Sequence, residues 1–184
     1  MQTTIIYIPG LGDRYDTFRA FALQFWKLWG VQASLVPIKW YDGESLESKL
    51  ARVTAAIDQV PPGQTIVLVG ESAGASLALH ASARHERISG VITLCGVTRN
   101  FTPISSYLRK RAPALDEAVN TLPNDFNVDV HSLRAVIDGV VGSKYSSTSN
   151  ATRHIIWSVG HLSTIFLCLT VYAPIITTIA KKLK

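Results

Sequence analysis

The sequence predicts a three-layer α/β/α sandwich with about six parallel strands, and two observations lead to this fold class. Short runs of apolar and β-branched residues alternate with segments of helical spacing along the 184 residues, an order that favours parallel strands joined through helices. The composition, 47% hydrophobic and 17% charged residues, is that of a well-buried globular protein whose sheet is covered on both faces. The length favours one domain, residues 1–184.

Six segments have the composition of strands. They cover residues 4–8, 33–38, 65–69, 88–95, 133–137 and 154–158. Because the carboxyl ends of parallel strands meet at one edge of a sheet, ligands bind at that edge in proteins of this class. The residues that follow each strand are therefore the first place to look for chemistry.

The segments between the strands have helical periodicity. Residues 18–29 carry aromatic side chains at helical spacing, which predicts a helix with a buried aromatic face and Asp16 as its N-cap. Residues 46–57 form a second amphipathic helix, and a third begins near residue 75. The connection between the fourth and fifth strands contains a helix from about residue 104 to 119, broken around Pro113.

Charge and cysteine content exclude several function classes. The net charge is +5, but the basic residues are scattered apart from the clusters 109–111 and 181–184, and no basic stripe is interleaved with aromatics. Nucleic-acid binding is therefore not expected. The two cysteines, Cys95 and Cys168, lack metal-ligand spacing and are expected to be buried free thiols.

The C-terminal segment 162–180 contains no charged residue and has the length of a membrane span. Pro174 and five serine or threonine residues favour a kinked helix that is buried in the core, with membrane association through this helix as the alternative. The N-terminus has no signal-peptide pattern, so a cytoplasmic location is expected.

A sharp turn is predicted between the third strand and the helix that follows it. Residues 65–80 read TIVLVGESAGASLALH, with the pattern G-E-S-A-G at residues 70–74. A turn this tight brings neighbouring backbones together, and Gly70 and Gly74 leave room for that approach. Ser72 then stands at the apex beside a helix N-terminus, which is a suitable position for a nucleophile.

Two further reactive groups follow later strands. Asp138 comes after the fifth strand and His161 after the sixth. A serine hydroxyl needs an imidazole to accept its proton, and the imidazole needs a carboxylate to fix its tautomer. We therefore expect Ser72, Asp138 and His161 to form a catalytic triad, with Asp125 and Asp129 as weaker alternatives for the acid.

An oxyanion hole is predicted from two backbone N–H groups. The glycine-rich turn at residues 9–12 follows the first strand, where the N–H of Leu11 can point toward the nucleophile. The second donor is the N–H of Ala73, the residue after the nucleophile.

These motifs together resemble the α/β-hydrolase superfamily in a minimal form, close in size to the smallest lipases and esterases. The resemblance covers nearly the whole chain and rests on G-E-S-A-G, the first glycine-rich turn, the D-x-x-V arrangement at residues 138–141, and Gly160-His161. It implies the α/β-hydrolase fold with the strand order 2-1-3-4-5-6. It also implies substrate contacts at Gly10 and at Tyr107, the latter on a segment, residues 101–126, that forms either a short lid or a plain crossover.

The implied function is a serine hydrolase that cleaves carboxylic esters or thioesters through an acyl-enzyme, with a small acyl ester as its partner and with no metal or organic cofactor. Acyltransferases and peptidases use the same triad, because only the pocket and the second nucleophile differ. A non-catalytic binding protein on a hydrolase scaffold is the alternative from another class.

Overall fold

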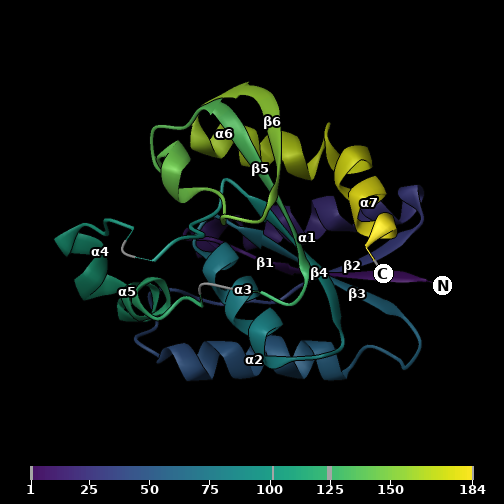
Figure 1. Ribbon diagram of the computed structural model, residues 1–184, viewed down its shortest axis with the longest axis horizontal. Helices are drawn as coiled ribbons and strands as arrows, with labels where there is room; N and C mark the ends of the chain where they lie inside the picture. The colour runs from purple at the N-terminus through teal and green to yellow at the C-terminus, as the bar shows by residue number, and fades with distance from the viewer. Residues whose placement is uncertain (1, 101, 124–125, 184) are drawn as a thin grey trace.

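A single parallel sheet of six strands forms the centre of the molecule, in the order β2-β1-β3-β4-β5-β6 (Figure 1). The computed structural model describes residues 2–100, 102–123 and 126–183. The order and the parallel pairing agree with the prediction from the sequence. The strands are β1 (Thr3–Ile8), β2 (Val31–Leu35), β3 (Thr65–Glu71), β4 (Ile88–Leu94), β5 (Asp129–Ile137) and β6 (Thr152–Val159).

Helices cover the sheet in two layers (Figure 1). One face packs against α1 (Asp16–Gln24), its 3₁₀ continuation η2 (Phe25–Trp29), α6 (His161–Leu169) and α7 (Ala173–Lys182). The other face packs against α2 (Leu46–Asp58), α3 (Gly74–Arg84) and α5 (Pro113–Asn120). The short elements η1 (Asp13–Tyr15), α4 (Ser106–Arg111) and η3 (Ser143–Tyr145) lie in connections. This is the three-layer arrangement that the alternation of strands and helices predicts.

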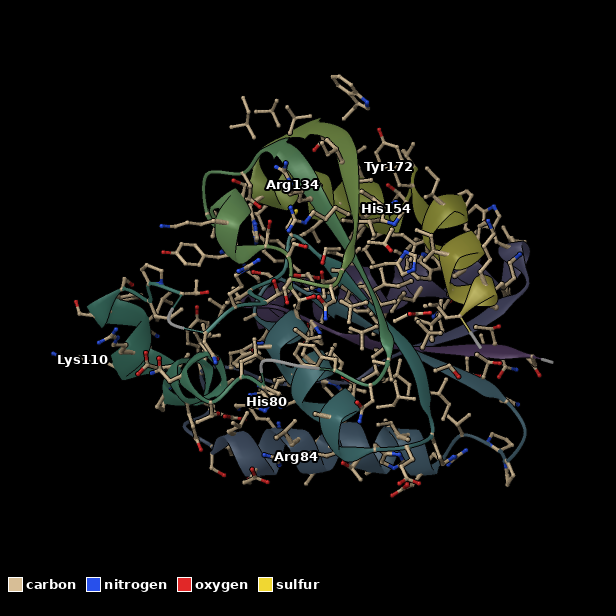
Figure 2. The ribbon with its side chains drawn as sticks, viewed as in Figure 1. His80, Arg84, Lys110, Arg134, His154 and Tyr172 are labelled. Carbon is tan, nitrogen blue, oxygen red and sulfur yellow. The ribbon has the colours of Figure 1, made fainter. Side chains whose placement is uncertain are left out.

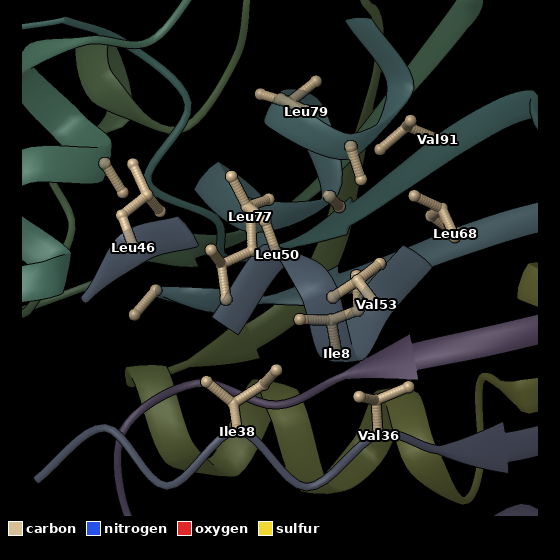
Figure 3. Close-up of a cluster of buried hydrophobic side chains, with 14 of the residues drawn as sticks. Ile8, Val36, Ile38, Leu46, Leu50, Val53, Leu68, Leu77, Leu79 and Val91 are labelled. Atoms are coloured by element: carbon tan, nitrogen blue, oxygen red, sulfur yellow. The ribbon is translucent and has the colours of Figure 1, made fainter. Parts of the chain in front are cut away.

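The central strands are buried on both faces. Every residue of β1 and of β3 is buried, as expected for parallel strands with helices above and below. Figure 3 shows part of the core on the α2–α3 side, where Leu50 and Val53 of α2 lie near Ile8 and Leu68 of the sheet. These strands hold the nucleophile turn and the first glycine-rich turn at their carboxyl ends.

The aromatic residues of the first helix are only partly buried. Trp26 is fully buried and its Nε1 donates to the Leu169 carbonyl at 3.0 Å, but Phe21 and Phe25 are exposed and pack edge to face on each other. Phe21 lies off the buried stripe of α1, which Arg19, Ala22 and Leu23 form. From Phe25 the chain tightens into a 3₁₀-helix with three residues per turn, so beyond this point an apolar face counted at 3.6 residues drifts toward solvent. The N-cap is Tyr15, and Asp16 is the first helical residue.

The C-terminal segment is two helices rather than one. The axes of α6 and α7 differ by 69°, and Pro174 lies in the first turn of α7, where its missing N–H costs no helical hydrogen bond. Cys168 and Ile176 are buried in the core, in agreement with the predicted kinked core helix. Within the described residues no single helix has both the length and the hydropathy of a membrane span; only the bent pair does by length and composition.

Candidate active site

Ser72 occupies a strained turn between β3 and α3. Its φ angle is 49°, in the left-handed region that residues with a side chain rarely adopt. A Cβ on Gly70 would lie 2.5 Å from the Ala75 Cα, and a Cβ on Gly74 would lie 2.2 Å from the Ile8 carbonyl oxygen. Both glycines are therefore required by close backbone approach, as predicted. The Ser72 N–H donates to the Leu94 carbonyl at 2.9 Å, which ties the turn to β4.

The structure brings the side chains of Ser72, His161 and Asp138 into one hydrogen-bonded row. His161 Nε2 lies 2.9 Å from Ser72 Oγ, and His161 Nδ1 lies 2.8 Å from Asp138 Oδ2. The Ser72 residue is 9% exposed, and the side chains of His161 and Asp138 are 7% and 6% exposed. In this arrangement Nδ1–H donates to the carboxylate, which leaves Nε2 free to accept the serine proton.

Asp138 uses its two carboxylate oxygens for different contacts. Oδ1 accepts hydrogen bonds from the backbone N–H groups of Val140 and Val141, at 2.8 and 3.0 Å, while Oδ2 faces His161. Burial acts to raise the pKa of Asp138, but the hydrogen bonds from His161 and the two N–H groups outweigh it, and the pKa lies below its ordinary value. The carboxylate is therefore ionised at neutral pH and its orientation is fixed by its own turn.

The predicted oxyanion donors lie on the two turns that meet at the nucleophile. A Cβ on Gly10 would lie 2.7 Å from Ser72 Cβ, so the first glycine-rich turn packs directly against Ser72. Within the part of the chain that the structure describes, the N–H groups of Leu11 and Ala73 donate to no other protein group. Neither N–H group is therefore used by the turn to which it belongs.

Tyr107 and Asp129 were also predicted as candidate site residues, but they lie outside the hydrogen-bonded row of Ser72, His161 and Asp138. Tyr107 lies on α4 and is 60% exposed, with its hydroxyl accepting from Arg111 at 2.6 Å. The Arg111 guanidinium also lies over the ring of Tyr41. Asp129 starts β5 at the amino end of the sheet, opposite Ser72, which removes it as the acid. Asp125 lies outside the described residues.

The 101–126 segment has two structurally different halves. It forms α4 and α5 on either side of Ala112, so the predicted break near Pro113 is present. Leu115 and Val119 of α5 belong to the core, whereas α4 has no buried residue. Only α4 therefore has the exposure expected of a lid; residues 101, 124 and 125 lie outside the described chain.

An apolar cavity of about 300 Å³ lies between α1 and α6. Its lining includes Glu71 and Leu162, which are the neighbours of Ser72 and His161 in the chain, but not Ser72, His161 or Asp138 themselves. The rings of Phe18 and Phe166 are stacked with centroids 5.1 Å apart. The lining residues, from α1 and α6 and their surroundings, are Tyr15, Phe18, Arg19, Glu71, Leu162, Ser163, Ile165, Phe166 and Leu169. Larger hollows of about 450–490 Å³ lie at the amino ends of β4 and β5 and along the β2 edge of the sheet, and Ser72 lines none of them.

Two groups near the row were not predicted from the sequence. The first is a buried polar network in which Arg19 and Tyr7 both donate to the Glu71 carboxylate. The second is Cys95, which follows β4; its Sγ, an Asp138 oxygen and a His161 ring nitrogen lie within 4.8 Å of one another. Burial raises the pKa of the Cys95 thiol, which opposes the thiolate that a metal ion would need.

The backbone of Cys95 is strained. Its φ angle is 47°, and its N–H donates to the Leu133 carbonyl at 2.8 Å. Such strain at a residue with a side chain is visible only in the structure, and the sequence pattern around Cys95 is that of an ordinary buried strand. Both cysteines are buried free thiols, as predicted.

Comparison with known proteins identifies the fold. No protein-family model matches the chain, and no curated protein matches its sequence. A metagenomic carboxyl esterase is 16% identical with a TM-score of 0.72 over 98% of this chain and 75% of its own. The pyrethroid hydrolase PytH is 13% identical with a TM-score of 0.71, covering 98% of both chains.

A third structure, from Xanthomonas campestris pv. campestris, is assigned to the alpha/beta hydrolase superfamily. It is 16% identical, with a TM-score of 0.66 over 99% of this chain and 100% of its own. The chain therefore has the α/β-hydrolase fold. At this level of identity the likeness extends to the fold alone.

Proposed function

We propose that this protein is a serine hydrolase that cleaves carboxylic esters or thioesters through an acyl-enzyme. The observation that carries the proposal is the row of hydrogen bonds from Ser72 through His161 to Asp138, at the carboxyl ends of three strands. The similar structures include proteins named as a carboxyl esterase and a pyrethroid hydrolase, which is in line with this activity.

The reaction begins at the serine oxygen. Ser72 Oγ attacks the acyl carbonyl carbon while its proton moves to His161 Nε2, and Asp138 stabilises the imidazolium through the hydrogen bond at Nδ1. The tetrahedral intermediate collapses when His161 gives the proton to the leaving alcohol or thiol. Water then attacks the acyl-enzyme, with His161 again accepting the proton, and releases the acid and free Ser72.

The N–H groups of Leu11 and Ala73 are proposed to hold the oxygen of the tetrahedral intermediate. Each such donor contributes about 2.7–4 kcal/mol to the stability of the transition state. The apolar cavity between α1 and α6 is proposed to hold the acyl chain, because its lining includes Glu71 and Leu162, the residues next to Ser72 and His161 in the chain. Its volume of about 300 Å³ fits a short to medium chain.

Labelling with a fluorophosphonate probe tests the proposal directly. We expect the wild-type protein to be labelled and to hydrolyse p-nitrophenyl esters, and Ser72→Ala and His161→Ala to do neither. The matched control is Ser48→Ala, which removes an exposed hydroxyl on α2 and touches none of the reacting groups. It should behave as the parent does.

The outcomes separate the alternatives. A folded parent that is neither labelled nor active would overturn the proposal and favour a binding protein. Labelling at Ser72 without ester turnover in water, but with product formed when an alcohol or amine acceptor is added, would favour an acyltransferase. A series of esters of increasing chain length, with a maximum shifted by Phe166→Ala, would locate the acyl chain in the cavity.

A further inference from the structure

The strongest unexplained feature near the candidate site is the buried guanidinium of Arg19. This side chain is 2% exposed and lies in α1. Nε donates to Glu71 Oε2 at 2.7 Å, and Nη2 donates to Glu71 Oε1. Nη1 donates to the Gly12 carbonyl at 2.9 Å and to Asp16 Oδ1 at 2.8 Å, while Nη2 reaches the Leu11 carbonyl at 3.4 Å. One side chain thus joins two separate turns.

These two turns are the ones whose relative position an oxyanion hole depends on. Glu71 precedes Ser72 in the nucleophile turn, and Leu11 and Gly12 belong to the turn that follows β1. Gly10 and Gly12 flank Leu11 and give this turn wide conformational freedom, and the φ angle of Gly12 is 99°. A loop of this kind needs an external contact to keep one N–H directed at a ligand.

We propose that Arg19 is a positioning residue that fixes the Leu11 turn against the nucleophile turn, and so sets the distance between the two oxyanion donors. The inference rests on the proposed function, since it concerns the same reaction. Arg19 also lines the cavity proposed for the acyl chain, but it donates a hydrogen bond to none of Ser72, His161 and Asp138. It acts through the carbonyls of Leu11 and Gly12 on one side and through Glu71 on the other.

The chemistry of the Arg19–Glu71 ion pair fits the positioning of the Leu11 turn better than a role in stability alone. Desolvation of two charges offsets much of their attraction, so a buried ion pair contributes little net stability compared with apolar packing. A guanidinium instead offers five donors in a fixed plane, and here it uses both edges at once. Burial acts to lower the pKa of Arg19, but the hydrogen bond with Glu71 outweighs it, so the group stays charged.

The chain offers a matched control at the same carboxylate. Tyr7 Oη also donates to Glu71 Oε2, at 2.7 Å, but among the described residues its phenol makes no hydrogen bond with the Leu11 turn. Burial, followed by the charge of Glu71, raises the pKa of Tyr7 well above its ordinary value, so the phenol remains a donor. Tyr7→Phe therefore perturbs Glu71 without releasing the turn.

The test compares Arg19→Lys, the double variant Arg19→Met/Glu71→Gln, and Tyr7→Phe on a short p-nitrophenyl ester. The double variant removes both charges, so no unpaired ion is left buried if Arg19→Lys fails to fold. We expect kcat to fall about ten- to a hundredfold in both Arg19 variants with KM within about twofold, since the loss falls on transition-state charge. The affinity for a boronic acid inhibitor should fall by a similar factor, and Tyr7→Phe should keep the parental kcat.

The possible outcomes separate the role of Arg19 from the proposed function. Parental kcat and inhibitor affinity in a folded Arg19 variant would overturn the role of Arg19 and leave the proposed function intact. So would an equal loss in Tyr7→Phe, because the effect would then pass through Glu71 rather than through the Leu11 turn. A parent without ester turnover would overturn both proposals, since the turns would then have no oxyanion to bind.

Discussion

Ser72 and His161 reach the candidate site from parts of the sheet with opposite surroundings. Ser72 follows β3, in which every residue is buried, whereas His161 follows β6, in which only Ile156 is buried. On the open face of this edge Trp157 is 83% exposed, together with Ile155 and Val159. The nucleophile is therefore held by packing on both faces of the sheet.

Local hydrogen bonds hold the acid and the base. Two backbone N–H groups fix the Asp138 carboxylate, and the Gly160 N–H donates to the Ile137 carbonyl at 2.8 Å directly before His161. The nucleophile is thus held by packing in the core of the sheet, whereas the acid and the base are held by hydrogen bonds within their own turns. Changes at the centre should act mainly on stability, and changes at the edge mainly on activity.

The largest effect is expected at the edge. Asp138→Asn can keep its turn, because an amide oxygen still accepts from Val140 and Val141, but its NH₂ then faces His161 Nδ1 and imposes the wrong tautomer. We expect kcat to fall about 10⁴-fold with a small change in thermal stability. Steady-state kinetics and thermal unfolding measure the two effects. Asp129→Asn, at the opposite end of the sheet, is the control; an equal loss there would contradict the assignment.

The second largest effect is a loss of stability at the buried Trp26, with the exposed Trp157 as the comparison. Trp26→Ala removes a fully buried side chain and its hydrogen bond to the Leu169 carbonyl, and should lower the free energy of unfolding by about 3–5 kcal/mol. Trp157→Ala removes an exposed ring on β6 and should change that free energy by less than about 0.5 kcal/mol. Urea titration measures both. A large loss for Trp157→Ala would mean that the edge strand is not independent of the core.

A smaller loss of stability is expected from a substitution at Gly74, and Gly139 serves as the comparison. Gly74→Ala would place a Cβ 2.2 Å from the Ile8 carbonyl oxygen, so backbone must move, at an expected cost of about 2–3 kcal/mol. Gly139→Ala meets no atom within 4 Å and should leave stability within about 0.5 kcal/mol of the parent. Equal midpoints for the two variants in urea would show that the nucleophile turn is less tightly packed than its geometry indicates.

The sequence predicted the features that depend on neighbouring residues. The glycine spacing around Ser72 and the order of Asp138 and His161 after their strands are local patterns, and the structure brings these three side chains together. The sheet order came from the resemblance rather than from the pattern. The local pattern could not predict which strands are covered on both faces. A strand rich in apolar residues does not reveal whether a helix packs on its outer face.

The same limit applies to contacts between distant segments. The Arg19–Glu71 pair is 52 residues apart in the chain, and Cys95 reaches the acid only because β4 and β5 are neighbours in the sheet. Phe21 was predicted to be buried from a period of 3.6, but the buried stripe of α1 is formed by Arg19, Ala22 and Leu23, and Phe21 lies off it. These features follow from the three-dimensional arrangement and have no signal in one sequence.

The smallest expected effect is a pH dependence at the edge. His131 on β5 and His154 on β6 face each other, with Nδ1 and Nε2 2.9 Å apart and stacked rings (Figure 2 labels His154). Burial lowers the pKa of both, the charge of His154 lowers that of His131 further, and the charge of Asp129 acts to raise the pKa of His131. Between the folded-state pKa values and the ordinary value of 6.5 the unfolded chain binds more protons, so stability falls as pH decreases through this range.

We expect a loss of a few tenths of a kcal/mol between pH 7 and pH 5, because the pair is partly exposed and solvent screens it. The variant His131→Thr removes one partner from the strand, and its stability should change less over the same range than that of the parent. His80 is the complication: it is buried on α3, its pKa is also lowered by burial, and it acts in the same direction (Figure 2). Because His80 is present in both proteins, the difference between their pH profiles isolates the edge pair, and identical profiles would assign the acid sensitivity to the core side of the molecule.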